Sequence, residues 1–477
     1  MKPAPDHAGN GWRRWGTAAL VALGLAAVWG AGGLQPRLLA ARGAARLNQA
    51  EPLENAPPLV GFTTVALGGF RGLLVDFLWM RAAELQQNGR YFELVQLADW
   101  ITKLQPRFAA IWSYHAWNLA YNVSVLMSDP ADRWRWVEHG IRLLRDEGLR
   151  YNPGSAKLYH ELAWLFRHKM GDDLDQAHWY YKRVWARQMT DALGGGRPDF
   201  TALRAAARGE GHPELRARAQ RLSREYRLDP VRMADVDDRY GPLDWRLPQT
   251  HAIYWAQQGL PFARARFDRQ QLERMTFHAL AASYFRGRLV GDPAGDGPLL
   301  LAPEPALRTR VAAAYEEGLR SFPDDQSYRT AHRNFLLEAV MISYTYNRRA
   351  EAQAIFDELR TRYPGPDTSG SLEDLIAQIW SQNAAEMNRE QAVATVEGAL
   401  FQSVFWQLLG DAGQSAGFGQ LAQLVWDRYM ADRRDKAEFA ERTGLPPLDT
   451  LRAQAAQRAA EALREAQAAG GAAYAPR

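Results

Sequence analysis

Six side chains between residues 244 and 255 combine aromatic rings with charged or titratable groups. A flat ring supplies contact area, and neighbouring carboxylate, guanidinium and imidazole groups can orient a bound peptide or sugar. The pattern predicts a partner-contact surface at Asp244, Trp245, Arg246, His251, Tyr254 and Trp255. In the alternative interpretation, the two tryptophans fill gaps between helices and Asp244 pairs with Arg246 or caps the following helix, because aromatic residues at helical spacing commonly lie in the core.

Acidic residues could carry a different chemistry, the hydrolysis of a glycoside. That reaction needs two carboxylates about 5 to 9.5 Å apart across a sugar-shaped cleft. The acids to consider are Asp76, Asp99, Glu161, Asp237, Asp238 and Asp244. No spacing in the sequence pairs them. A closed ring of helical hairpins with two of these acids across its mouth would favour an enzyme, and an open superhelix with an uncharged or basic groove would favour a scaffold.

Metal and cofactor motifs start in this chain without being completed. His160 and Glu161 begin like a zinc-protease motif, but Trp164 stands where the second histidine is required. Asp172, Asp173 and Asp175 begin like a calcium loop that lacks its later glycine and glutamate, so helix capping explains them better. The chain has no cysteine, which excludes thiolate nucleophiles and disulfides. We therefore expect no catalytic residue, cofactor or metal site.

Composition narrows the class of partner. The chain has 477 residues, 47% of them hydrophobic, and a formal net charge of only +4. Nucleic-acid-binding domains are usually strongly basic. We expect no nucleic-acid partner and expect one or more protein partners.

An uncharged segment near the N-terminus is long enough to cross a membrane. Residues 15 to 34 are 20 residues without a charge, and a membrane-spanning helix needs about 20. A cleaved signal peptide is the alternative, although its apolar region usually has about 7 to 15 residues. We predict an N-terminal tail at 1–14, a transmembrane helix at 15–34 and a linker at 35–58.

The orientation of this predicted span rests on indirect features. Three basic residues precede the segment (Lys2, Arg13 and Arg14) and three follow it (Arg37, Arg42 and Arg46), so the positive-inside rule does not choose between the two orientations. The short tail and the lack of cysteine favour a cytoplasmic N-terminus. We expect a single-pass protein of the inner (cell) membrane with a periplasmic or extracytoplasmic body. A second apolar run, from Leu59 to Met80, contains Arg71 and Asp76, which favours a helix of the body close to the membrane over a second span.

The body shows one apolar stripe per helix. In one helix the stripe is Leu94, Leu97, Ala98, Ile101 and Leu104, at intervals of three and four. A stripe this narrow must be buried against a neighbour, so the hairpins are units of a stack. We predict helical repeats at 59–190, an irregular arginine-rich insertion at 191–248 with a solvated helix from Pro213, further repeats at 249–433, and a polar alanine-rich tail at 434–477.

The window from Ala331 to Pro364 resembles the tetratricopeptide repeat (TPR) family. Ala352, Phe356 and Pro364 fall at the spacing of the second helix of that repeat. The first helix departs from the family at Leu336, Ala339, Val340 and Ser343. The resemblance implies an all-α solenoid that docks proteins at a bacterial envelope, as tetratricopeptide adaptors do. We therefore expect a membrane-tethered scaffold without enzymatic activity; the alternative is a carbohydrate-active α/α toroid that binds or hydrolyses a glycan.

Overall fold

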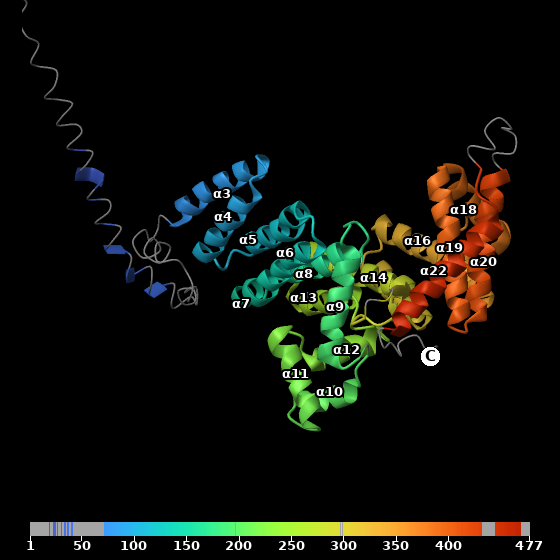
Figure 1. Cartoon of the computed structure of the whole chain (residues 1–477). Helices are drawn as coiled ribbons and strands as arrows, with labels where there is room; N and C mark the ends of the chain where they lie inside the picture. Colours follow the sequence, from blue (N-terminus) through green and yellow to red (C-terminus); the bar gives the residue numbers. More distant parts are fainter. Residues whose placement is uncertain are drawn as a thin grey trace, which may run out of the picture.

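The computed structural model describes residues 71–195, 197–295, 297, 299–431 and 444–468, together with isolated positions between 19 and 41. These residues are nearly all helical, which confirms the predicted all-α class. The regular strands in this part of the chain are a short antiparallel pair, β1 (Arg288–Val290) and β2 (Leu300–Ala302), in which Leu289 lies opposite Leu301. Figure 1 shows the helices arranged as a row of hairpins that begins at α3 and α4.

The first units of the row form where the apolar stripes predict them. In the helix 91–104 every residue of the predicted stripe is buried, from Leu94 to Leu104. Gly89 closes the preceding turn with a φ of +69°, a conformation that glycine adopts without strain. Asp129 caps the helix 130–142, and Pro130 occupies the first position of that helix. The elements are α3 (Arg71–Gln87), α4 (Tyr91–Leu104), α5 (Ala109–Trp117), η2 (Asn118–Val123), η3 (Ser124–Leu126), α6 (Pro130–Arg142), η4 (Leu143–Gly148), α7 (Leu149–Tyr151), α8 (Ala156–Trp164) and η5 (Leu165–Gly171).

The third hairpin contains a long insertion. Its first helix is α8 with η5, and α13 packs along both of them, whereas the next helix in sequence, α9, contacts η5. Helical periodicity in the sequence does not reveal a partner this many residues away along the chain. The predicted irregular insertion contains short helices, one of which begins at Pro213 as expected. The elements are α9 (His178–Leu193), α10 (Phe200–Ala207), α11 (Pro213–Glu225), α12 (Pro230–Tyr240) and α13 (Pro248–Gly259).

The remaining units continue the row to a helical bundle at the other end (Figure 1). The window that resembles a tetratricopeptide repeat is a helical hairpin of α16 and α17, in which Ala352 and Phe356 are buried. Asn347 takes a left-handed conformation in its turn, with a φ of +57°. The elements are η6 (Leu260–Phe262), α14 (Arg266–Arg286), η7 (Pro305–Leu307), α15 (Arg308–Ser321), α16 (Gln326–Thr345), α17 (Arg349–Arg362), η8 (Pro366–Thr368), α18 (Leu372–Glu386), α19 (Arg389–Leu408), α20 (Ala412–Ala431) and α22 (Leu448–Ala468).

Stacking follows one rule along the row. The first helix of a hairpin contacts the hairpin before it: α8 contacts α5 and η4, α14 contacts α8 and α13, and α16 contacts α14 and α15. One hydrophobic core consequently runs from Val75 to Ile376, and a second core holds α19, α20 and α22 together. The row is open, with α3 and α19 at opposite ends (Figure 1), whereas the toroid of the alternative hypothesis would close on itself.

The C-terminal helix packs against the body. The stretch 448–468, within the predicted polar alanine-rich tail, is helical and packs against α19. Leu451, Ala455 and Ala459 are buried there. Small side chains at intervals of four let two helices approach closely, so alanine can build an interface without large apolar residues.

The predicted membrane span falls mostly outside the residues that the structure describes. Within the described residues, no helix combines the length and the apolar character that a crossing of the bilayer requires.

Candidate functional site

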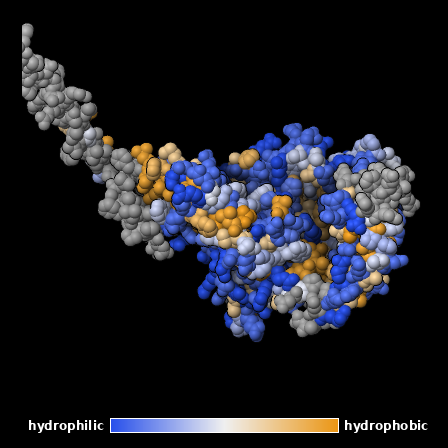
Figure 2. All heavy atoms as spheres, turned by 45° about the horizontal axis from the view of Figure 1, so that its top comes forward, coloured by the Kyte–Doolittle hydropathy of each residue, from blue (hydrophilic) through white to orange (hydrophobic). Residues whose placement is uncertain are grey.

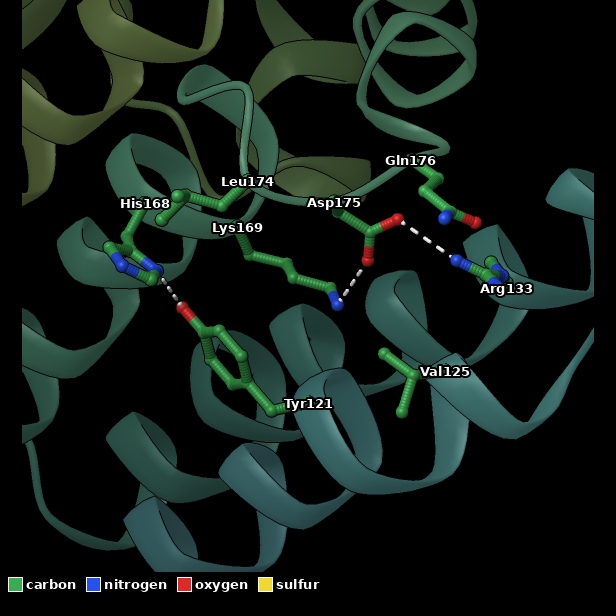
Figure 3. A pocket seen from close by; sticks show the side chains of 8 residues that line it. All are labelled: Tyr121, Val125, Arg133, His168, Lys169, Leu174, Asp175 and Gln176. Atoms are coloured by element: carbon green, nitrogen blue, oxygen red, sulfur yellow. Dashed lines mark hydrogen bonds and ion pairs between the residues drawn. The ribbon is translucent and has the colours of Figure 1, made fainter.

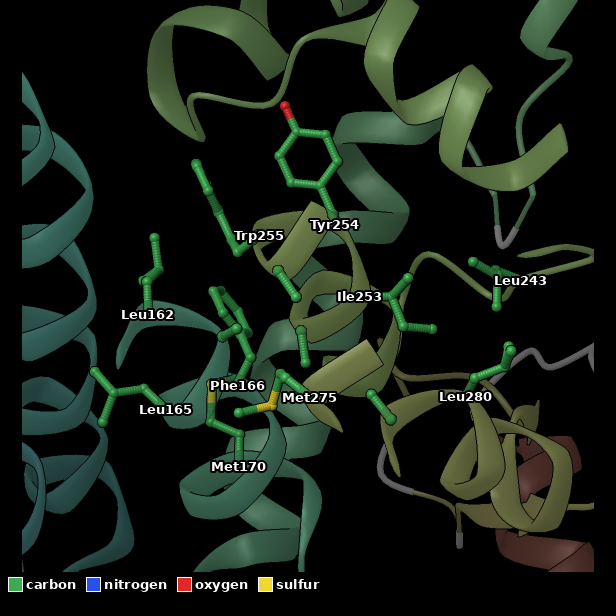
Figure 4. Packing of buried hydrophobic residues seen from close by; sticks show 14 of the residues in the cluster. Leu162, Leu165, Phe166, Met170, Leu243, Ile253, Tyr254, Trp255, Met275 and Leu280 are labelled. Atoms are coloured by element: carbon green, nitrogen blue, oxygen red, sulfur yellow. The ribbon is translucent and has the colours of Figure 1, made fainter. Parts of the chain in front are cut away.

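The predicted partner-contact cluster lies mainly in the core. Trp245 and His251 have no exposed surface, and Tyr254 and Trp255 are only 2% and 4% exposed. Figure 4 shows Tyr254 and Trp255 among the apolar side chains that join α13 to its neighbours. Because the protein itself encloses these rings, a partner could reach only the partly buried Asp244 and Arg246 from the surface.

Three of these rings form hydrogen bonds with other groups of the protein. Trp245 donates its indole N–H to Oδ1 of Asp237 at 3.2 Å. The Nε2 of His251 lies 2.9 Å from the carbonyl oxygen of Trp245, and the hydroxyl of Tyr254 accepts the backbone N–H of Asp229 at 2.9 Å. Burial lowers the pKa of His251 to about 4, so its ring is neutral at pH 7 and donates from Nε2. These contacts match the alternative interpretation, in which the cluster stabilises the fold.

Asp244 and Arg246 pair with each other, which the same interpretation predicts. The Nη2 of Arg246 lies 2.7 Å from Oδ2 of Asp244. Asp244 also accepts the backbone N–H groups of Arg246 and Leu289, at 3.0 and 3.3 Å. The carboxylate therefore ties the loop before α13 to strand β1.

The acids considered for glycoside hydrolysis lie apart from the cavities described below. Asp237 pairs with Arg197 at 2.6 Å, Asp238 with Arg204 at 2.8 Å and Asp99 with Lys103 at 2.7 Å. Asp76 is exposed on α3, and burial raises the pKa of Glu161 on α8. No two of these carboxylates face each other across any of these cavities.

Metal ligation finds no support in the described part of the chain, where no group of three histidine, aspartate or glutamate side chains could hold an ion. Asp175 accepts the backbone N–H of Ala177 at 2.8 Å in the turn before α9, a helix whose N-cap residue is Ala177 and which has no side-chain cap. Asp173 pairs with Lys182 at 2.8 Å and with Arg286 at 2.7 Å.

The largest cavity described here is a groove of about 620 Å³ between the first helices of successive hairpins. We call it the α14–α16 groove. Its volume suits a drug-sized ligand or a few residues of an extended peptide. Its lining combines buried aromatic side chains with three arginines, one neutral imidazole and two acids. Its lining includes Arg167, Asp172, Arg274, Phe277, His278, Phe285, Arg286, Tyr315, Asn334, Phe335 and Glu338.

One arginine of the groove has no acidic partner among the residues that the structure describes. Arg274 pairs with Asp325, and Arg286 pairs with Asp173. The guanidinium of Arg167 instead lies over the ring of Trp164, 5.6 Å from its centroid. Desolvation, reinforced by Arg167 and Arg274, lowers the pKa of His278, so this imidazole is neutral at pH 7. Arg167 is therefore the cation of the groove that can still bind an anionic group of a ligand.

A second cavity, of about 420 Å³, lies beside η5 and is drawn in Figure 3. We call it the η2–η5 pocket, and it is lined by Tyr121, Val125, Arg133, His168, Lys169, Leu174, Asp175 and Gln176. Two of its walls are π-helical turns, which are rare and often occur at functional sites. Lys169 lies 2.5 Å from Asp175, which also accepts Arg133 at 3.3 Å.

Aromatic contacts link the two cavities. Tyr121 places its hydroxyl 2.9 Å from Nδ1 of His168. Desolvation lowers the pKa of His168 and raises that of Tyr121, so a neutral imidazole accepts from a protonated phenol at pH 7. The ring of His168 also stacks on Trp164, with centroids 4.6 Å apart. Trp164 is thus shared between His168 of the η2–η5 pocket and Arg167 of the α14–α16 groove.

A third cavity, of about 380 Å³, holds two acids that the sequence did not suggest, Glu273 and Glu317. Arg239 pairs with Glu317 at 2.8 Å, and Arg269 lies 4.0 Å from Glu273. Burial raises the pKa of Glu273. Each carboxylate has an arginine partner, so this cavity offers little unbalanced charge to a ligand.

The sequence does not identify the two larger cavities as sites, although part of the signal is present. Trp164, Arg167 and His168 lie at i, i+3 and i+4, which places them on one helix face. The side chains that complete the groove come from α14 and α16, and only the stacking of hairpins brings those helices together. Comparison with protein-family models and with curated proteins finds no match for the chain.

Proposed function

We propose that this chain is a membrane-tethered, TPR-like scaffold whose α14–α16 groove binds an extended segment of a protein partner at the bacterial envelope. The observation that carries the proposal is Arg167, a cation of the groove without an acidic partner in the described part of the chain. An arginine supplies directed donors to a carboxylate.

The groove chemistry indicates the kind of segment that would bind. An acidic side chain of the partner would pair with Arg167, and a neighbouring apolar side chain would pack on Ala282 or Ala331, which are partly exposed in the groove. Asn334 is exposed in the same groove and offers amide groups to a peptide backbone. The first helices of successive hairpins line this groove, and such solenoid surfaces suit extended ligands.

Two features support the finer assignment to a TPR-like repeat. The residues that resemble the second helix of the repeat, Ala352 and Phe356, are buried in the hairpin of α16 and α17. The α14 and α16 helices each pack against both helices of the hairpin before them. The tether and the extracytoplasmic placement of the body rest on the uncharged segment 15–34.

Site-specific photo-crosslinking in native cells tests this proposal. A photoreactive amino acid replaces Ala331 in the groove, and a matched control replaces Arg320, which is exposed on α15. We expect one protein to crosslink at position 331 and not at position 320. Arg167→Ala should reduce that adduct about tenfold, the equivalent of about 1.4 kcal/mol for a lost charged hydrogen bond. Equal adducts at both positions, or an Arg167→Ala variant that crosslinks as wild type does, would contradict the proposal.

A second candidate function is glycan binding, which one observation favours. Trp117 is 40% exposed and stacks on Tyr121, with centroids 5.6 Å apart, next to the η2–η5 pocket. An exposed ring of this kind can pack on the apolar face of a sugar. Titration with envelope glycan fragments, using Trp117→Ala as the matched variant, tests it: saturable binding that the substitution removes would support this candidate, and no binding by wild type would reject it.

A further inference from the structure

The first hairpin of the row exposes apolar side chains at a place where helical arrays usually present polar ones. Leu73, Phe77 and Met80 of α3 are 65%, 62% and 67% exposed. Their spacing of i, i+4 and i+7 puts them on one face of the helix. We call this face the α3 stripe. Terminal units of a helical array need a polar outer face to remain soluble, so the stripe calls for a cover.

The charged side chains beside the stripe give little reason to expect a charged protein partner. Arg81 pairs with Glu84 at 2.6 Å, and Arg90 pairs with Glu93 at 2.5 Å, in both cases between well-exposed side chains. These two pairs add no net charge beside the stripe, and the exposed carboxylate of Asp76 lies on the same helix, so apolar area is the main attraction of this surface. Figure 2 shows apolar atoms gathered over this end of the body.

The position of the stripe along the chain points to its cover. The uncharged segment 15–34 is separated from α3 by the residues 35 to 70, a stretch of 36 residues. If segment 15–34 spans the bilayer, as proposed above, α3 is the helix of the body that the chain holds nearest to the lipid surface.

We propose that the α3 stripe rests on the lipid bilayer, with Leu73, Phe77 and Met80 inserted at the boundary between headgroups and acyl chains. This inference rests on the proposed membrane tether. Interfacial helices bury their apolar face about 5 to 10 Å into this boundary. The contact gives the body a second attachment besides the span, so the row of hairpins and its groove take a fixed orientation relative to the membrane. Because the two ion pairs are balanced and the exposed carboxylate of Asp76 lies on the same helix, the contact does not need anionic lipid.

The absence of cysteine makes a direct test simple, because one introduced cysteine carries the only label. The full-length Phe77→Cys variant is labelled with an environment-sensitive fluorophore and reconstituted into zwitterionic nanodiscs. The matched control is Phe267→Cys, since Phe267 is 65% exposed at the start of α14, away from the first hairpin. We expect the probe at position 77 to emit at shorter wavelength and to be quenched by lipids with a nitroxide near the headgroup, while the probe at 267 shows neither effect.

Each other outcome has a definite meaning. A blue-shifted probe at 77 that nitroxide lipids do not quench is covered by protein, from this chain, a second copy or a partner, and overturns the proposal. A probe that stays in water also overturns it. Adding anionic lipid should leave the quenching unchanged, and Leu73→Ser with Met80→Ser should abolish it without altering the unfolding midpoint.

The failure of the tether can be distinguished from the failure of the stripe. An alkaline wash of the same membranes reports on the tether, because a spanning helix resists extraction. A chain that washes out while its probe at 77 is still quenched on added vesicles retains the stripe and loses the tether. A chain that resists the wash with an unquenched probe retains the tether and loses the stripe.

Discussion

The Nζ atom of Lys169 lies 2.5 Å from Oδ2 of Asp175, and both side chains are almost completely buried. Arg133 approaches the other oxygen of the same carboxylate at 3.3 Å. Two cations thus share one anion at the back of the η2–η5 pocket (Figure 3). Although desolvation opposes ionisation, the hydrogen bonds from Lys169 and Ala177 keep the pKa of Asp175 below its usual value.

The buried pair should make Asp175 costly to neutralise. We expect Asp175→Asn to lower the free energy of unfolding by about 3 to 5 kcal/mol, because it leaves Lys169 and Arg133 without their counter-charge. The control is Asp99→Asn, which breaks the more exposed pair with Lys103 and should cost at most about 1 kcal/mol. Urea unfolding followed by tryptophan fluorescence measures both, and equal losses would show that the buried pair has no special weight.

Local features of the sequence predicted local features of the fold. The apolar stripe from Leu94 to Leu104 is buried as expected, and Ser371 with Asp374 forms the expected capping box of α18. The pairing of α8 with α13 was not predictable, because the insertion between them contains helices whose own periodicity is equally good. A stripe shows that a helix is buried against something, but it does not name the partner.

The site was predicted less well than the fold, for a related reason. The chemistry of Trp245 and His251 suits a contact surface, yet the same aromatic character lets such residues fill a core, and both are buried. Arg167 does not stand out in the sequence. It matters because it has no acidic partner in the described part of the chain and because α14 and α16 line the same groove. A single sequence does not reveal either relationship.

Burial of Trp245 can be distinguished from partner contact by stability alone. We expect Trp245→Ala to cost about 3 to 5 kcal/mol, because it leaves a large cavity and removes a donor from Asp237. Trp117→Ala is the matched control, and its 40% exposed ring should cost roughly 1 kcal/mol or less. Thermal unfolding followed by circular dichroism gives both values. Similar small losses would argue that Trp245 is available to a ligand after all.

The closeness of packing between α15 and α16 can be tested by substituting a glycine. A Cβ added at Gly318 of α15 would lie 2.5 Å from Cε1 of Tyr328, a fully buried ring of α16. Gly318→Ala should therefore destabilise the protein by about 1 to 3 kcal/mol. Gly398 lies within α19 with nothing within 4 Å of its added Cβ, so Gly398→Ala should stabilise by up to about 1 kcal/mol through helix propensity. Chemical denaturation of the two variants should thus show effects of opposite sign, and a neutral Gly318→Ala would mean that α15 and α16 are less closely packed than they are here.

Buried histidines should make the fold sensitive to mild acid. The pKa of His251 is about 4 in the folded chain because burial disfavours its charged form, against an ordinary value of 6.5. Below pH 6.5 the unfolded chain binds a proton that the folded chain does not, so stability is present above that pH and is lost as the pH falls toward 4. For His251 alone the loss between pH 7.5 and pH 5 should be about 2 kcal/mol. His115, with a pKa of about 3 and a buried ring, adds to the same slope.

The matched comparison isolates the share of His251 in that slope. His251→Gln keeps a side-chain donor for the carbonyl of Trp245 but cannot titrate, so its free energy of unfolding should change less between pH 7.5 and pH 5 than that of wild type. Urea unfolding at the two pH values measures both proteins. If His251→Gln and wild type lost the same stability on acidification, the acid sensitivity would have to come from other groups, and the buried, neutral state assigned to His251 would be wrong.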